Sequence, residues 1–187
     1  MGAVIIDIWA DLAHLDSYLA KVALESALAE WEHGDEVEIL WHAYQVERPK
    51  TYDAHRVVAL AAAAGRADQL RELMMKAFVT EQESPTDPAV LLRLATEAGV
   101  DAADTERILG NDEYGYDVRV DEATAAQIGF GAAPYLVIDR KYGVGGPQPS
   151  GVYMNALQYA HDHVDETPEE RGASVCGGAC GSCGCGA

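Results

Sequence analysis

Residues 1–175 of this 187-residue chain contain no cysteine, because all four lie at its carboxyl-terminal end: Cys176, Cys180, Cys183 and Cys185. A fold formed by the residues before them holds neither a disulfide nor a thiolate metal site. Its stability must therefore come from the burial of apolar side chains. Any sulfur chemistry of the protein is expected from the carboxyl-terminal residues.

Basic residues are also scarce. Lys and Arg number 13 against 31 Asp and Glu, which gives a formal net charge of −18. Nucleic acids and anionic membranes both attract clustered Lys and Arg, so neither partner is expected. No apolar run reaches the roughly 18 residues of a transmembrane helix, and the first residues lack the basic region of a secretory signal. The expected location is the cytoplasm, where structural disulfides are uncommon.

The first 49 residues predict a strand, a helix and a second strand. Residues 3–9 form an apolar run rich in β-branched side chains, which is typical of a buried strand. A helix is expected from Asp16 or Ser17, either of which could cap it, and residues 36–46 predict the second strand. A connection this short gives a parallel strand pair with a right-handed crossover.

Residues 52–128 predict helices alone, because apolar side chains recur at helical spacing. One such stripe consists of Leu70, Leu73, Met74, Ala77 and Phe78. Residues 135–138 and 142–144 then predict an antiparallel hairpin, and a last helix is expected to begin at Pro149. From residue 165 the hydrophobic periodicity is lost and Gly and Cys become frequent, so a linker is expected there.

The order of these elements and several segments of the sequence resemble one known family. The likeness is carried by Ile6–Asp11, Tyr18–Lys21, Asp53–Arg56, Ala132–Asp139 and Lys141–Pro149. These segments are similar to the DsbA family of thioredoxin-fold proteins, and most of all to its FrnE-type branch of dithiol–disulfide isomerases. Neighbouring groups are the kappa glutathione transferases and the 2-hydroxychromene-2-carboxylate isomerases.

The resemblance implies an α/β fold of the thioredoxin-like (DsbA-like) type with an inserted α-helical domain. Residues 1–49 and 129–164 would form the thioredoxin-like domain, residues 50–128 the helical insertion, and residues 165–187 a flexible Gly/Cys-rich tail. The sequence does not indicate the oligomeric state.

The family's catalytic motif is missing from this sequence. In the family the first helix begins with Cys-Pro-Trp-Cys or a close variant, and the matching positions here hold His14, Leu15, Asp16 and Ser17. Thiol–disulfide exchange needs a thiolate, and neither an imidazole nor a hydroxyl forms a mixed disulfide. The family's reaction is therefore not expected at this motif, and whether the protein is an enzyme stays open.

Three interpretations of this degenerate motif are open. His14 and Ser17 are three residues apart, so they could share a helix face and form a Ser–His nucleophile. Ser17 could hold the sulfur of glutathione, as a serine does in the kappa-like relatives, although their serine corresponds to His14. The plainest interpretation is a helix cap at Asp16 or Ser17 beside a solvent-exposed His14.

Ala133 and Pro134 are the expected substrate-binding residues. In the family the proline that matches Pro134 is cis, lies opposite the start of the first helix, and presents backbone groups to an extended peptide or to glutathione. The resemblance therefore implies a groove for a peptide or small thiol even where catalysis is lost. The alternative is a proline that only begins a strand.

The tail cysteines have the spacing Cys-x3-Cys-x2-Cys-x-Cys. They could exchange thiols and disulfides, bind one zinc ion through four thiolates, ligate an iron–sulfur cluster, or have no specified role. A flexible linker of about 20 residues spans roughly 25 Å, so the tail sulfurs could reach the groove beside His14 and Pro134.

Two main functions follow. In the first, Cys176, Cys180, Cys183 and Cys185 are the catalytic residues of a DsbA/FrnE-like oxidoreductase that holds its substrate at Pro134. In the second, the groove is a redox-inactive module that binds a peptide or glutathione. Isomerase or transferase chemistry of the kappa type is a third alternative.

Several histidines have plainer explanations. His161 and His163 are two residues apart in the last helix, so they point to different faces and are not expected to share a metal. Trp41, His42 and Tyr44 are expected to be ordinary strand packing.

Overall fold

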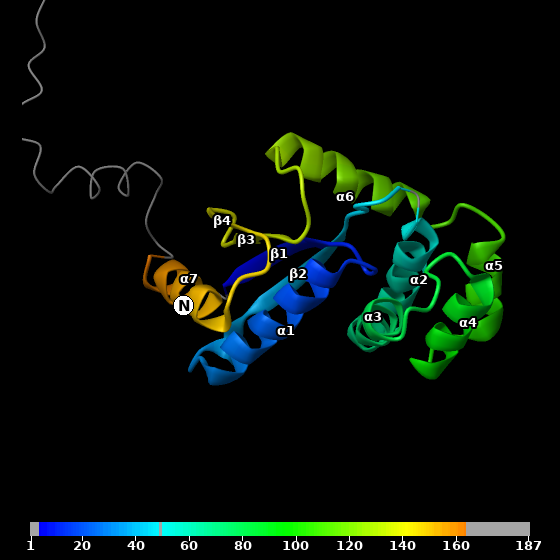
Figure 1. The fold of residues 1–187 in the computed structure, drawn as a ribbon, viewed down its shortest axis with the longest axis horizontal. Helices are drawn as coiled ribbons and strands as arrows, with labels where there is room; N and C mark the ends of the chain where they lie inside the picture. Colours follow the sequence, from blue (N-terminus) through cyan, green and yellow to red (C-terminus); the bar gives the residue numbers. More distant parts are fainter. Residues whose placement is uncertain (1–3, 49, 164–187) are drawn as a thin grey trace, which may run out of the picture.

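The computed structural model describes residues 4–48 and 50–163. Their strands form one four-stranded sheet in the order β2-β1-β3-β4 (Figure 1). β1 (Ile5–Ala10) is parallel to β2 (Glu38–Ala43) and antiparallel to β3 (Tyr135–Ile138), which pairs with β4 (Tyr142–Gly145). The predicted parallel pair and the predicted hairpin are both confirmed.

The two faces of the sheet are covered by different helices. α1 (Leu15–Glu30) and α7 (Ser150–Asp162) pack against each other on one face, where Ile6, Ile8 and Leu24 are buried. α6 (Gly115–Ile128) contacts β2 on the other face, where the indole of Trp9 donates a hydrogen bond to the Asp121 carbonyl at 3.1 Å. This arrangement of helices on both sides of a short mixed sheet confirms the expected α/β thioredoxin-like architecture.

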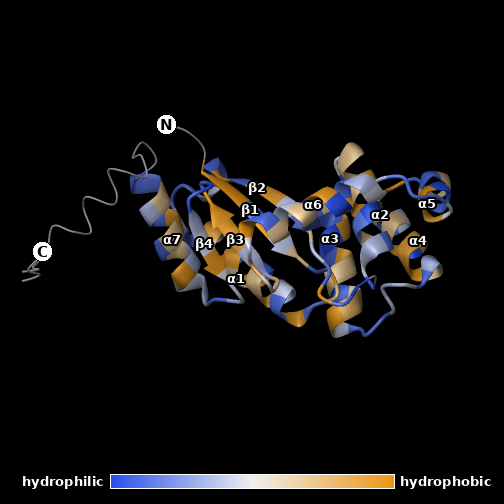
Figure 2. Cartoon of the chain, turned by 90° about the horizontal axis from the view of Figure 1, so that it is seen from above, coloured by the Kyte–Doolittle hydropathy of each residue, from blue (hydrophilic) through white to orange (hydrophobic). Residues whose placement is uncertain are grey.

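A group of helices separates β2 from β3 along the chain, as the sequence predicts. These helices are α2 (Tyr52–Ala63), α3 (Ala67–Met75), α4 (Pro88–Glu97), α5 (Ala102–Leu109) and α6. A π-helical turn, η2 (Lys76–Thr80), continues α3. Figures 1 and 2 show α2 to α5 gathered beyond the end of the sheet, apart from α7.

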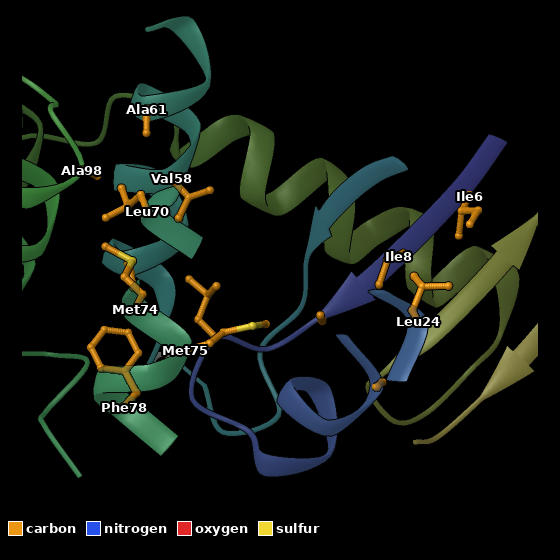
Figure 3. Close-up of a cluster of buried hydrophobic side chains, with 14 of the residues drawn as sticks. Ile6, Ile8, Leu24, Val58, Ala61, Leu70, Met74, Met75, Phe78 and Ala98 are labelled. Atoms are coloured by element: carbon orange, nitrogen blue, oxygen red, sulfur yellow. The ribbon is translucent and has the colours of Figure 1, made fainter. Parts of the chain in front are cut away.

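The core extends from the sheet into the helices without a break. Figure 3 shows Ile6, Ile8 and Leu24 in its sheet portion and a second portion formed by side chains of α2, α3 and the π-helical turn. The predicted apolar stripe supplies much of this second portion, because Leu70 and Met74 are fully buried and Phe78 nearly so. Burial of apolar side chains therefore joins the two parts of the fold.

Several boundaries differ from those predicted. The first helix begins at Leu15 rather than at Asp16 or Ser17, with His14 at the cap position and no capping bond from its side chain. β2 is shorter than residues 36–46 because a 3-10 turn, η1 (Gly34–Glu36), precedes it. The last helix begins at Ser150, with Pro149 as its cap residue.

No helix within residues 4–48 and 50–163 is long and apolar enough to cross a bilayer. The four cysteines and the remainder of the expected tail lie outside the described residues.

Candidate functional site

The residues predicted to form the site meet at the carboxyl end of β1. β1 leads into α1 through residues 11–14, so His14 follows the end of this strand closely. On the other side of β1, the antiparallel register pairs Trp9 with Tyr135. Continuing that register by one residue places Pro134 beside Ala10. The start of α1 and the Ala133–Pro134 segment therefore lie at the same end of the sheet, and the peptide bond between Ala133 and Pro134 is cis.

Asp11 organises the turn between β1 and α1. One of its carboxylate oxygens accepts the Ala13 N–H at 3.0 Å, and the other accepts the Val46 N–H at 2.7 Å. Its own backbone N–H donates to the Ser17 hydroxyl at 3.1 Å. Because Asp11 is buried, these bonds satisfy groups that water cannot reach. Asp11 thus connects β1, α1 and the segment after β2.

Ser17 has a structural contact rather than a capping one. Its side chain is 1% exposed, and its hydroxyl accepts the Asp11 N–H across the turn instead of an N–H of its own helix. The predicted cap at Asp16 or Ser17 is therefore wrong. Ser17, which the resemblance aligns with the second cysteine of the motif, is therefore buried.

His14 is half-buried rather than solvent-exposed as the plainest interpretation expected. Its Nδ1 is buried and has no hydrogen-bond partner within the described part of the chain. Among these residues His14 and Ser17 share no hydrogen bond, so the structure does not assemble the Ser–His pair considered from their spacing. An unpaired imidazole here lacks the base–nucleophile contact that acyl transfer requires.

The backbone beside Pro134 carries unused hydrogen-bonding groups. The Pro134 carbonyl accepts the Gly146 N–H at 2.9 Å, which joins the beginning of β3 to the end of β4. Ala133, one residue earlier, makes no backbone hydrogen bond within the described residues, although it is only 4% exposed and Pro134 is also buried. An N–H and a carbonyl at the end of a strand are the groups with which an extended chain pairs.

Apolar surface adjoins the start of α1 on the helical side. Leu15 is 55% exposed and Leu19, one turn later, is 47% exposed. Leu15 also lines a hollow of about 420 Å³, whose wall has an apolar part with Phe78 and Val79 and a polar part with Lys50, Gln82, Glu83 and Ser84. The exposed pair Leu15 and Leu19 is thus a small apolar surface beside a mixed hollow.

His42 belongs to an ionic cluster that the sequence analysis missed. Its Nε2 lies 2.9 Å from Asp7 Oδ1, and its Nδ1 lies 2.8 Å from Asp121 Oδ1. The Trp9 indole stacks on the ring, with centroids 4.3 Å apart. Burial alone would lower the pKa of His42, but the bonds to Asp121 and Asp7 outweigh burial and raise the pKa above its usual value. Through these two contacts His42 joins β1, β2 and α6.

One signal for this cluster was present in the sequence. Asp7 and His42 are polar residues inside two apolar strands. Side chains two apart in a strand share a face, so Asp7 lies on the same face of β1 as Trp9, which stacks on His42. Asp121 comes from a distant helix, and no local pattern indicates its contact with β2.

The pKa of His55 is shifted in the opposite direction to that of His42. It lies on α2 in the interior, with Nε2 3.3 Å from the Tyr44 carbonyl. Burial lowers the pKa of His55 to about 4, in spite of the charge of nearby Asp11. At neutral pH the ring is uncharged, so Nε2 donates to Tyr44 and Nδ1 is left as an acceptor.

Within the described ranges, no three His, Cys, Asp or Glu side chains are grouped so that they could hold a metal ion. His161 stacks on His33 with ring centroids 4.1 Å apart, whereas His163 stacks on Tyr159. His161 in α7 and His163 just after it thus have separate neighbours, as their spacing predicts.

Solved structures share this architecture. A probable DsbA oxidoreductase from Streptomyces coelicolor is 27% identical, with 88% of this chain and 92% of that chain covered and a TM-score of 0.82. A thioredoxin-like oxidoreductase from Silicibacter pomeroyi is 18% identical over 86% and 88% of the two chains, with a TM-score of 0.71. A Proteus mirabilis DsbA bound non-covalently to a peptide is 18% identical over 84% and 90%, with a TM-score of 0.57.

No curated protein is similar enough in sequence to be matched to this chain. The DSBA-like thioredoxin domain family matches residues 5–158, which include every strand, α1 and most of α7. The protein therefore belongs to the DSBA-like thioredoxin domain family.

Proposed function

We propose that this protein holds an extended polypeptide, or a small thiol, beside Ala133 and Pro134, and that its tail cysteines exchange thiols with what is bound. The observation that carries the proposal is the unused backbone of Ala133, next to a strand end and near the start of α1. The Proteus mirabilis DsbA of the same fold holds a peptide non-covalently, which supports a polypeptide as the ligand. We also assign the chain to the FrnE-type branch, on the segments quoted above.

The tail is the source of thiols in this proposal because residues 1–175 contain none. A thiolate of one tail cysteine attacks a substrate disulfide, which forms a mixed disulfide and releases one substrate thiolate. A second tail thiolate then attacks the tail sulfur of the mixed disulfide and releases the other substrate thiolate. The substrate gains two electrons, the tail is left as a disulfide, and a small-molecule thiol must reduce it before the next cycle.

A redox-inactive binding module is the second candidate, and the sealed position of Ser17 favours it. If the tail cysteines do no exchange, the groove still offers the Ala133 backbone to a peptide or to glutathione. Glutathione would need a sulfur contact other than Ser17, whose hydroxyl is buried against Asp11. Zinc bound by the four tail cysteines is an alternative use of the same thiols, and metal analysis of the full chain purified without a histidine tag tests it.

The groove is tested by titrating the isotope-labelled full chain with an apolar heptapeptide that contains no cysteine. The amide signals of Ala133 and Gly146 are expected to shift. Leu15→Glu places a charge on the adjacent apolar surface and should weaken binding about tenfold, a loss of about 1.4 kcal/mol. Val152→Glu is the matched control, because Val152 is also exposed but lies on α7. An unshifted Ala133 amide, or equal effects of the two variants, would contradict the groove.

A further inference from the structure

A second hollow lies on the other side of β1 from Pro134, between the sheet and the inserted helices. It has a volume of about 290 Å³ and is lined from the ends of β1 and β2 and from α2, α3 and α6. Ligand pockets begin at about this size, and a cavity about half as large holds benzene. The hollow therefore has room for a small organic molecule, and the proposed peptide groove does not use it.

Arg71 is the arginine of this hollow, which His42 also lines. It lies on α3, is 7% exposed, and stacks its guanidinium over Trp41 with Cζ 4.6 Å from the ring centroid. Nη1 donates to Asp68 Oδ1 at 2.5 Å, and Asp68 is almost fully exposed. Within residues 4–48 and 50–163 this guanidinium makes no other hydrogen bond, although it carries five N–H donors. Stacking occupies the flat face and leaves donors at the edge free to bind a carboxylate.

His55 supplies an acceptor in the wall of the same hollow. Because Nε2 donates to the Tyr44 carbonyl, Nδ1 of the neutral ring accepts hydrogen bonds. No partner of Nδ1 is found among the described residues. Arg71 and His55 line the same hollow, so a donor and an acceptor border one small space.

The rest of the lining restricts the ligand further. Val58, Ala62 and Met75 are apolar, and Figure 3 shows Val58 and Met75 projecting from their helices toward the strands. Asp117 and Asp121 also line the hollow and disfavour a second negative charge. This lining suits a ligand with one carboxylate and a short apolar chain.

We propose that this hollow binds a 2-amino or 2-hydroxy acid with a short aliphatic side chain. Its carboxylate lies on the edge of the Arg71 guanidinium, its amino or hydroxyl group donates to His55 Nδ1, and its chain contacts Val58 and Met75. Such a ligand would connect the helical insertion to the sheet, because Arg71 and His55 come from helices and Trp41 from β2.

Four related probes test this site by calorimetry on the full chain: L-leucine, 2-hydroxy-4-methylpentanoate, 4-methylpentanoate and L-leucinamide. The first two carry both groups, the third lacks the donor, and the fourth lacks the carboxylate. We expect one or both of the first two to bind at least tenfold more tightly than the last two. A preference between leucine and the hydroxy acid identifies the donor. Equal binding of all four, or none at millimolar concentration, would overturn the proposal.

Arg71→Met keeps an apolar side chain over Trp41 and removes the cation. We expect it to abolish the preference for the carboxylate probes, whereas Arg66→Met, at the exposed end of the same helix, should leave it unchanged. The nitrogen-bound proton signal of the Arg71 guanidinium in the unmodified protein should shift on addition of the preferred probe. If Arg71→Met does not fold, the guanidinium signal of the unmodified protein tests the site by itself. A shift supports binding at Arg71, and an unshifted signal contradicts it.

Discussion

The Ser17 hydroxyl lies 3.1 Å from the backbone nitrogen of Asp11 and accepts its N–H inside the protein. By the resemblance drawn from the sequence, Ser17 corresponds to the second cysteine of the family's motif. In this chain the position holds the turn between β1 and α1 together, and its hydroxyl is hidden from solvent. The Ser17 hydroxyl thus helps to maintain the geometry of the turn.

Ser17→Ala is expected to destabilise the protein. The substitution leaves the buried Asp11 N–H without an acceptor, which costs about 1–3 kcal/mol of the free energy of unfolding. Urea unfolding followed by circular dichroism measures the loss. Ser26→Ala on the exposed face of the same helix is the control and should change stability by no more than about 0.5 kcal/mol. Equal stabilities of the two variants would show that the Asp11 contact contributes nothing.

Cysteines placed at positions 14 and 17 are expected to create a redox site. In a chain whose four tail cysteines are serine, His14→Cys with Ser17→Cys places one thiol at the cap position of α1 and the other in its first turn. The helix start favours the thiolate, so the variant should reduce insulin disulfides in the presence of dithiothreitol. The single variant Ser17→Cys should not. A folded double variant no faster than the single one would show that more than sulfur has been lost from this site.

His42 should make the protein less stable as the pH rises. Its pKa is raised above 6.5 by Asp121 and Asp7, the charged groups that face it from α6 and β1. Stability from a raised pKa is fully present below the unfolded value and is lost as the pH rises through the folded value. The difference in unfolding free energy between the unmodified protein and His42→Gln should therefore be larger at pH 6 than at pH 9. A titration of His42 by proton NMR with a midpoint below 6.5 would refute the ionic cluster.

His55 should make the protein less stable as the pH falls. Burial holds its pKa at about 4, so between pH 6.5 and 4 the unfolded chain takes up a proton that the folded protein does not. Stability is lost as the pH falls through this range, by roughly 3 kcal/mol in total. His55→Leu should be less sensitive to acid than the unmodified protein when urea midpoints at pH 4.5 and 7 are compared. A variant with unchanged acid sensitivity would place the proton uptake elsewhere.

The sequence predicted the fold well because apolar spacing and turn residues are local signals. The strand at Tyr135–Ile138, the stripe from Leu70 to Phe78 and the hairpin at residues 139–141 all follow from neighbours in the chain. In that hairpin Asp139 and Arg140 both have positive φ, which matches the twist of two paired strands. Such features need no knowledge of the tertiary structure.

The contacts at the sites were harder to predict. Asp121 bonds His42 although the two are 79 residues apart in the chain. The Arg71 guanidinium on α3 stacks over the Trp41 ring on β2. From the sequence, the hydroxyl of Ser17 could accept an N–H of its own helix or the N–H of Asp11, and only the packing of the turn selects Asp11. Residue type alone therefore marked Ser17 correctly as part of a helix start but gave it the wrong partner.

The central claim is that residues 1–175 of this family member have no redox nucleophile of their own. The most direct test is insulin reduction by the full chain and by a full-length variant with Ser at positions 176, 180, 183 and 185, with dithiothreitol as reductant. We predict measurable reduction by the unmodified chain and none above background by the variant. Undiminished turnover in the variant would contradict the claim.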